Sequence, residues 1–377
     1  MSVRTYTKQE QEPASSEVAE VAPGVLRLQL PVSMPGLGHV NCYALVDSDG
    51  AALVDPGLPG EESWSALVDR LEQAGIPLRR VHTTVVTHSH PDHYGGSHQL
   101  REETGAELLA HAAFTSSPAA DDANADIDLE LLELDAEALV ELWKAKLADR
   151  GSTPWGTRRE PPPDEAIRLF IQSNVEGRVP RFRVPEPTIR VADSDPVRLA
   201  GRDWFAVHTP GHTTDHLCLW DPTEGVLLSG DHVLPTITPH IAGSTELDDP
   251  LAAFFGSLAR VGAFEGVKVC LPAHGHPFTD LRGRTDSIRR HHVERLDVLR
   301  AAAAALGDAP VEAYMKELFS ERAWGDMAAS ETFAHLEHLR VIGEADSSRG
   351  ADGLLRYRLK VPGHHGSGPS EGSADAA

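Results

Sequence analysis

Short apolar runs that end in Gly, Pro or a polar side chain recur along this chain. Val81–Val86 is rich in β-branched residues and is typical of a buried strand. Trp204–His208, Gly225–Ser229 and Val267–Leu271 have the same character, and each runs into a tight loop. In a layered α/β fold, the loops of neighbouring strands gather at one edge of the sheets. The pattern therefore predicts an α/β fold whose strand ends converge.

The periodicity changes from strand to helix between residues 115 and 187. Apolar positions in Asp126–Arg150 recur at spacings of three and four, and Asp164–Gln172 is a second predicted helix. We expect a helical insertion at 115–187 that lies over the strand ends as a lid. Its aromatic residues either line a substrate pocket or form the insertion's own core: Trp143, Trp155 and Phe170.

The C-terminal part predicts a small separate module at 284–361. Helices are expected at Thr285–Leu306, Pro310–Phe319 and Ala328–Val341, followed by a loop at Asp346–Gly353 and a strand at Leu354–Leu359. This arrangement resembles a winged-helix module, whose third helix enters the major groove in DNA-binding members. The third helix offers two Glu and one Arg here, which does not favour base reading. We expect this module to serve packing or a homodimer contact instead.

Length and composition set further expectations. A chain of 377 residues with 41% hydrophobic residues suits one large domain and a smaller module. Residues 1–20 and 362–377 are polar and are expected to be disordered. The first of these segments has no apolar stretch typical of a secretory signal, and no run of 18 apolar residues predicts a membrane span. The three cysteines give no disulfide framework, so we expect a cytoplasmic protein.

The charge balance bears on the partner. The net charge is −23, from 57 acidic and 34 basic residues. Nucleic-acid binding depends on Lys and Arg that neutralise phosphates, so a nucleic-acid partner is not favoured. Arginines between residues 158 and 190 form a modest local patch, for which solvated charges are the default interpretation.

The loops after the predicted strands carry side chains that bind metals. Thr87–His93 packs three histidines and one aspartate into a single short segment, and three later loops add one candidate each. The candidates are His88, His90, Asp92, His93, His212, Asp231 and His274. Imidazole and carboxylate ligands suit zinc, while iron and manganese also accept this donor set.

This ordered set is similar to that of the metallo-β-lactamase-fold hydrolases. The resemblance implies a four-layer αββα sandwich as the catalytic domain, at residues 21–283. It assigns one metal to His88, His90 and His212. It assigns the second metal to Asp92, His93 and His274, with Asp231 as a bridge between the two. Asp55, in the Asp-Pro-Gly segment after an early strand, would orient ligands without binding metal.

The implied activity is hydrolysis by two metal ions, with zinc expected first. A metal-bound hydroxide would be the nucleophile, and Asp92 would also orient it. His216, four residues after His212, either supports substrate and ligands or is a structural histidine. Asp215 stands where many relatives have glycine, which leaves the local turn open.

The sequence defines the substrate less narrowly than it defines the metal ligands. Members of the family with a similar C-terminal tail include an endoribonuclease and acyl-carrier-protein thioesterases of polyketide pathways. The negative charge and the apolar insertion favour a small-molecule acyl substrate, a thioester first and a lactone or other ester next. An endoribonuclease or phosphodiesterase and a single-iron sulfur dioxygenase-like enzyme are the alternatives.

Overall fold

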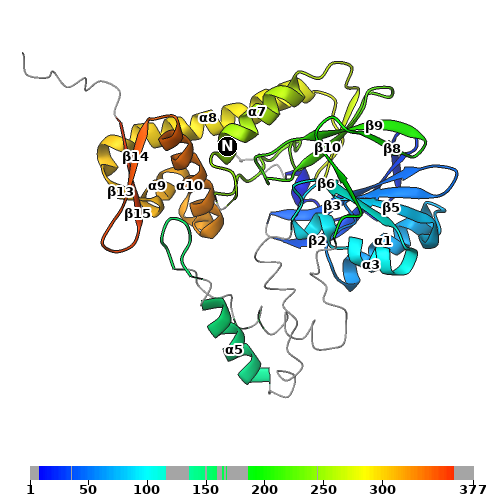
Figure 1. The fold of residues 1–377 in the computed structure, drawn as a ribbon, viewed down its shortest axis with the longest axis horizontal. Coiled ribbons are helices and arrows are strands. Elements are labelled where there is room, and N and C mark those ends of the chain that lie inside the picture. The colour runs from blue at the N-terminus through cyan, green and yellow to red at the C-terminus, as the bar shows by residue number, and fades with distance from the viewer. Residues whose placement is uncertain are drawn as a thin grey trace, which may run out of the picture.

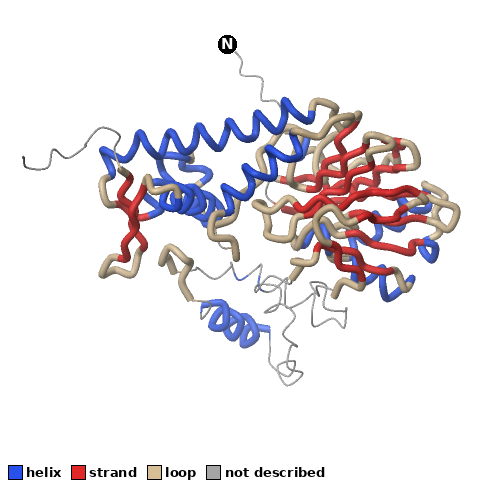
Figure 2. The backbone as a smooth tube through the Cα atoms, turned by 45° about the horizontal axis from the view of Figure 1, so that its top comes forward, coloured by secondary structure: helices blue, strands red, loops and turns tan. Residues whose placement is uncertain are grey.

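Two sheets face each other in the part of the molecule drawn at the right of Figures 1 and 2. The computed structural model describes residues 8–34, 36–115, 136–148, 151–158, 164, 167, 186–243 and 245–360. Within these residues the first sheet has the order β1-β2-β3-β4-β5-β6-β7 and the second has the order β12-β11-β10-β9-β8.

The first sheet is antiparallel from β1 to β4 and parallel from β4 to β7. Its strands are β1 Ala19–Ala22, β2 Val25–Met34, β3 Leu37–Val46, β4 Ala51–Val54, β5 Val81–Val85, β6 Glu107–His111 and β7 Ile189–Val191. The second sheet is antiparallel except for the β11–β12 pair. Its strands are β8 Pro196–Leu199, β9 Arg202–His208, β10 Leu217–Asp221, β11 Val226–Gly230 and β12 Val269–Pro272.

Helices cover both outer faces of the sheet pair. Helices α1 (Glu61–Gln73) and α3 (Ser97–Thr104) pack on the first sheet, where Leu67 and Leu100 join its outer core. Helices α7 (Pro250–Gly262) and α8 (Leu281–Leu306) cover the second sheet (Figure 1). The four-layer αββα sandwich predicted from the sequence is therefore confirmed.

Strand β11 shows why an unbroken apolar run forms a central strand here. All its residues are buried, and successive side chains point to opposite faces. Leu228 lies in the core between the two sheets, together with Trp204 of β9. Leu227 lies in the core under α7. Both faces are thus covered, which an alternating polar pattern would not allow.

The C-terminal elements are α8, β13 (Ala309–Pro310), α9 (Val311–Leu318), α10 (Asp326–Val341), β14 (Ala345–Arg349) and β15 (Leu355–Leu359). Their strands form a sheet in the order β13-β15-β14, and strand β14 lies where the sequence predicted a loop. The expected boundary at residue 284 falls in the first turn of α8, and the winged-helix resemblance stays a prediction. Among the described helices, none combines the length and apolar composition needed to cross a bilayer.

Trp155 belongs to the core shared with the C-terminal elements. Its ring lies 5.4 Å from that of Phe333 on α10, and its carbonyl accepts a hydrogen bond of 2.8 Å from Leu355 N. It is 4% exposed, so it does not line an open substrate pocket. Helix α5 (Ala136–Ala148) is described, but most of the predicted lid at 115–187, including Phe170 and the Trp143 side chain, lies outside the described residues.

Residues 8–20 include the short 3-10 helix Gln9–Gln11 and the start of β1, whereas the sequence predicts disorder over residues 1–20. The buried carboxylate of Glu10 accepts hydrogen bonds from the backbone of Thr236 (2.7 Å) and Ile237 (3.0 Å), which fixes the segment across the loop after β11. A polar sequence does not reveal such a remote pairing. Residues 1–7 and the predicted disordered tail at 362–377 lie outside the described residues.

Candidate metal centre

The ends of successive strands place the candidate residues at one edge of the sandwich. His88 and His90 follow β5, and Pro91 occupies the first turn of the short helix α2 (Pro91–Tyr94). Helix α2 carries Asp92 and His93. The remaining candidates follow β9, β11 and β12: His212, Asp231 and His274. The structure therefore brings together all the side chains that the sequence singled out as ligands.

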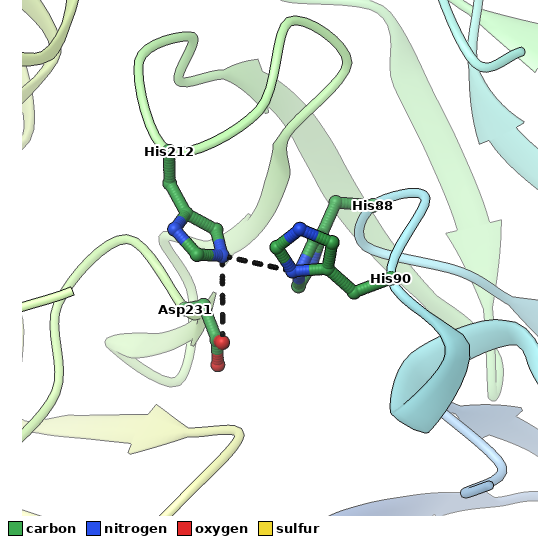
Figure 3. Close-up of side chains that lie close together, drawn as sticks. All are labelled: His88, His90, His212 and Asp231. Carbon is green, nitrogen blue, oxygen red and sulfur yellow. Dashed lines mark hydrogen bonds and ion pairs between the residues drawn. The ribbon is translucent and has the colours of Figure 1, made fainter. Parts of the chain in front are cut away.

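One group consists of three imidazoles and one carboxylate (Figure 3). His90 Nδ1 lies 2.9 Å from His88 Nε2 and 3.1 Å from His212 Nε2. Asp231 Oδ2 lies 3.6 Å from His212 Nε2. The nitrogen atoms of three rings thus point to one small volume beside the Asp231 carboxylate.

The second group consists of Asp92, His93 and His274. Asp92 Oδ2 lies 3.5 Å from His93 Nε2 and 3.4 Å from His274 Nε2. Asp231 reaches this group as well, with Oδ1 at 3.3 Å from His274 Nε2 and Oδ2 at 3.6 Å from His93 Nε2. Its carboxylate therefore lies between the two groups and contacts both.

These residues fit metal ions. Two ligands at about 2.0–2.1 Å from a tetrahedral zinc ion lie about 3.3 Å apart, close to the separations within each group. His93 Nε2, His274 Nε2 and Asp231 Oδ1 are buried and have no hydrogen-bond partner. Buried polar atoms without partners cost free energy, so a cation at this position would satisfy three of them at once.

The remaining ring nitrogens fix the orientation of the imidazoles. His212 Nδ1 donates to the His240 carbonyl at 2.6 Å, and His274 Nδ1 donates to the His39 carbonyl at 2.6 Å. Because Nδ1 is bound to a carbonyl in each ring, Nε2 is the atom that faces the centre and would bind a metal in its deprotonated form. The sequence analysis missed His39 and His240, since a backbone carbonyl leaves no signal in residue type.

Asp55 holds His93 in the same way. Its Oδ2 lies 2.9 Å from His93 Nδ1 and accepts from Thr87 Oγ1 at 2.8 Å, while Oδ1 accepts from Thr87 N at 2.9 Å. Asp55 adopts the left-handed backbone conformation, with φ at 55°. It contacts His93 but lies outside both groups of candidate ligands.

His216 has both ring nitrogens engaged. Its Nε2 accepts from Asp231 N at 3.0 Å, so its Nδ1 donates to Thr209 Oγ1 at 2.7 Å. No ring nitrogen is left for a substrate. Its contact with Asp231 positions the backbone of that residue.

Asp215 is buried beside the histidine-rich loop. Its Oδ1 accepts from Ser89 Oγ at 3.1 Å, and burial raises its pKa to about 6. The carboxyl group therefore ties the loop around His212 to the loop that carries His88 and His90.

The histidines of the two groups differ in their affinity for protons. Burial, and then the neighbouring imidazoles, hold the pKa of His88 well below its usual value, and burial lowers the pKa of His90 to about 3. Burial also acts on His93 and His274, but facing carboxylates outweigh it. They raise the pKa of His93 well above its usual value and that of His274 to about 10. The second group thus concentrates negative charge, which would also attract a cation.

Comparison with known proteins identifies relatives along most of the chain. The model of the metallo-beta-lactamase superfamily matches residues 35–296. A probable metallo-hydrolase of Bacillus subtilis (strain 168), YqjP, is 24% identical over 84% of this chain and 92% of its own length. A metallo-beta-lactamase family protein of Thermus thermophilus superposes with a TM-score of 0.68 at 29% identity, over 90% of this chain and 100% of that one.

Two further matches extend this picture. A beta-lactamase domain protein of Burkholderia ambifaria superposes with a TM-score of 0.70 at 28% identity, and covers 93% of this chain and 96% of its own. An atrochrysone carboxyl ACP thioesterase of Aspergillus chevalieri is 30% identical over 28% of this chain and 32% of its own length. The two structural relatives share nearly the whole fold, whereas the thioesterase shares a limited segment.

Proposed function

The chain belongs to the metallo-β-lactamase superfamily and is a metal-dependent hydrolase; from this premise we propose that it cleaves an ester-like bond of a small acyl substrate. A thioester is the preferred substrate, followed by a lactone or another ester. One observation carries the proposal: the Asp231 carboxylate lies between two groups of candidate ligands, all buried except the partly buried His90, and contacts both. This arrangement suits a pair of cations, and many enzymes use such pairs for hydrolysis.

We assign one metal to His88, His90 and His212 and the other to Asp92, His93 and His274, with Asp231 as the shared ligand. Zinc is the metal we expect first, because the donors are imidazole nitrogens and carboxylate oxygens. Iron and manganese are compatible with the same donors.

The cations, when bound, supply Lewis acidity and lower the pKa of a coordinated water to about 7. The protein's own residues supply orientation. Asp55, His39 and His240 hold ligand imidazoles with Nε2 free, and His216 fixes the backbone of Asp231. Asp92, which faces both His93 and His274, is in addition assigned to orient the attacking water. No serine or cysteine nucleophile is needed.

Two observations support an acyl substrate. The Aspergillus chevalieri relative is a thioesterase for atrochrysone carboxyl ACP, and its matching segment is 30% identical to this chain. The net charge of −23 does not favour the phosphate contacts that RNA binding needs.

The test is a substrate panel on zinc-loaded protein: an acyl thioester, a lactone, a p-nitrophenyl ester and single-stranded RNA. We expect turnover of the thioester, and its loss together with loss of bound metal in His90→Ala and Asp231→Ala. Full activity of a metal-free variant would contradict the proposal. Cleavage of RNA that weakens steeply with salt would replace it by the nuclease alternative, and one iron per chain would replace it by the dioxygenase alternative.

A further inference from the structure

We propose that Glu331, on helix α10 of the C-terminal elements, is a positioning residue for His212 and acts through His240. The inference rests on the proposed function, because it assumes that His212 binds metal. It gives the C-terminal elements a part in the metal centre, although none of the candidate ligands lies on them.

The connection begins at the metal centre. His212 Nδ1 donates to the carbonyl of His240 at 2.6 Å, and this bond sets the direction in which His212 Nε2 points. His240 lies in the segment between β11 and α7, where the described residues form no helix or strand. Such a segment needs outside contacts to hold a carbonyl in place.

Glu331 supplies one of these contacts. His240 Nδ1 lies 3.5 Å from Glu331 Oε2, and the Glu331 side chain is 12% exposed. The other carboxylate oxygen accepts from Arg295 Nη1 on α8 at 2.9 Å. The carboxylate is therefore fixed from one side by Arg295 and reaches His240 with the other oxygen.

The same loop rests on α10 at a second point. Gly243 N donates to Ser330 Oγ at 3.0 Å. A Cβ atom at Gly243 would overlap the Phe333 ring and lie 2.8 Å from the Ser330 carbonyl oxygen. The backbone thus packs directly against the helix, so a change on α10 reaches the loop without an intervening layer.

The start of the segment between β11 and α7 is held by contacts that do not involve Glu331. Glu10 binds the backbone of Thr236 and Ile237, and Arg284 donates to the carbonyls of Leu234 and Ile237. Loss of the Glu331 contact should therefore leave the fold and Asp231 in place. Its effect should fall on the residues around His240, and so on the metal bound by His212.

The experiment measures zinc affinity without substrate. Wild type, Glu331→Gln and the control Arg295→Gln are loaded with zinc and titrated with a chelator, and the unfolding midpoint in urea is recorded for each. Arg295→Gln breaks the same buried ion pair but keeps the carboxylate beside His240. We expect Glu331→Gln to lower the affinity for one of the two zinc ions about 10-fold to 100-fold. Arg295→Gln should change that affinity by less than about twofold.

A second comparison isolates the path through His240. In a His240→Asn background, Glu331→Gln should lower the zinc affinity no further, because the imidazole that faces the carboxylate is already absent. Equal weakening in Glu331→Gln and Arg295→Gln, unchanged zinc affinity in Glu331→Gln, or additive losses in the double variant would overturn the inference. Failure of the wild type to bind two zinc ions would instead overturn the proposed function.

Discussion

Asp55 shows how one buried carboxylate can prepare an imidazole for metal binding. It accepts hydrogen bonds from the backbone and hydroxyl of Thr87, which fix the carboxylate, and its Oδ2 faces His93 Nδ1 at 2.9 Å. Nδ1 of His93 is thereby bound to Asp55, and Nε2 is the ring nitrogen that faces the centre.

We therefore expect Asp55→Asn to lower zinc affinity about 10-fold to 100-fold while the fold is kept. The amide can present its NH₂ group to His93 and lacks the negative charge that favours the Nδ1 proton. Zinc affinity is measured by chelator competition, with the exposed Asp203→Asn as a control that should bind as wild type does. Unchanged affinity in Asp55→Asn would show that this contact does not orient a ligand.

The side chains of the site could be predicted from the sequence, whereas the groups that orient those side chains could not. His88, His90, Asp92 and His93 stand together in the sequence, and the spacing of metal-competent loops adds His212, Asp231 and His274. The carbonyls of His39 and His240 act through backbone atoms, which any residue would present. The roles of His216 and Asp215 depend on which atoms face them, and that is set only by the fold.

Helix α7 supports the His212 loop from outside the second sheet. Ser257 Oγ donates to the Pro210 carbonyl at 2.9 Å, and Gly211 packs directly against Phe254. Gly211 has φ at 139°, and a Cβ there would lie 2.7 Å from Phe254 N. The glycine is therefore required both by the backbone conformation and by the close approach of the helix.

Gly211→Ala should destabilise the protein by about 2–4 kcal/mol and displace His212, because neither the helix backbone nor the loop can move away. Gly256→Ala on the same helix is the matched control. Gly256 has no neighbour within 4 Å of an added Cβ, so alanine there should stabilise by about 0.5–1 kcal/mol. Urea unfolding measures both, and equal effects of the two substitutions would contradict this account of α7.

Helices α8 and α10 contact each other through a buried histidine pair. His335 Nδ1 donates to the Glu331 carbonyl, so His335 Nε2 accepts from His292 Nδ1 at 3.1 Å. Burial lowers the pKa of His335 to about 4, and burial with the neighbouring imidazole lowers that of His292 to about 2. Both rings are thus neutral in the folded protein and take up protons more readily when it unfolds.

Because the unfolded state binds more protons below pH 6.5, stability should fall as the pH falls below that value. Each histidine contributes a slope of up to about 1.4 kcal/mol per pH unit. Replacing His292 by Phe should reduce the slope between pH 6.5 and pH 5, measured by urea unfolding. A slope in His292→Phe as steep as in wild type would refute the assignment.

Whether most segments form a helix or a strand could be predicted from periodicity. Which strands pair and which side chains share a core could not. The predicted helix at Thr285–Leu306 is α8, and the strand at Val81–Val86 is β5. Strand β14 was expected as a loop because its sequence, Ala-Asp-Ser-Ser-Arg, has no apolar alternation, and pairing with β15 decides its conformation. For Trp155 the sequence left a substrate pocket and the insertion's own core as alternatives, and the core it shares with Phe333 was neither of these.

At the scale of the whole molecule, one hydrophobic core crosses the expected domain boundary. It contains Leu227 of the second sheet, Phe254 of α7, Ile288 of α8 and Leu336 of α10. Burial of apolar surface is the main stabilising contribution to folding, so elements that share a core depend on each other. The C-terminal elements and the sandwich should then unfold together.

Hydrogen exchange read by mass spectrometry along a urea series measures this coupling. Peptides from β9–β11 and from α9–α10 should lose protection at the same urea concentration, because the core they share is lost in one step. Loss of protection in α9–α10 at a clearly lower urea concentration would show that the C-terminal part is an independent unit.

The central claim is that the chain binds two metal ions around Asp231. Native mass spectrometry of the metal-free protein, titrated with zinc, measures it most directly. The account predicts a species with two zinc ions per chain, and loss of that species in Asp231→Ala, since the aspartate contacts both ligand groups. Saturation at one metal ion per chain, or a two-zinc species that persists in Asp231→Ala, would contradict it.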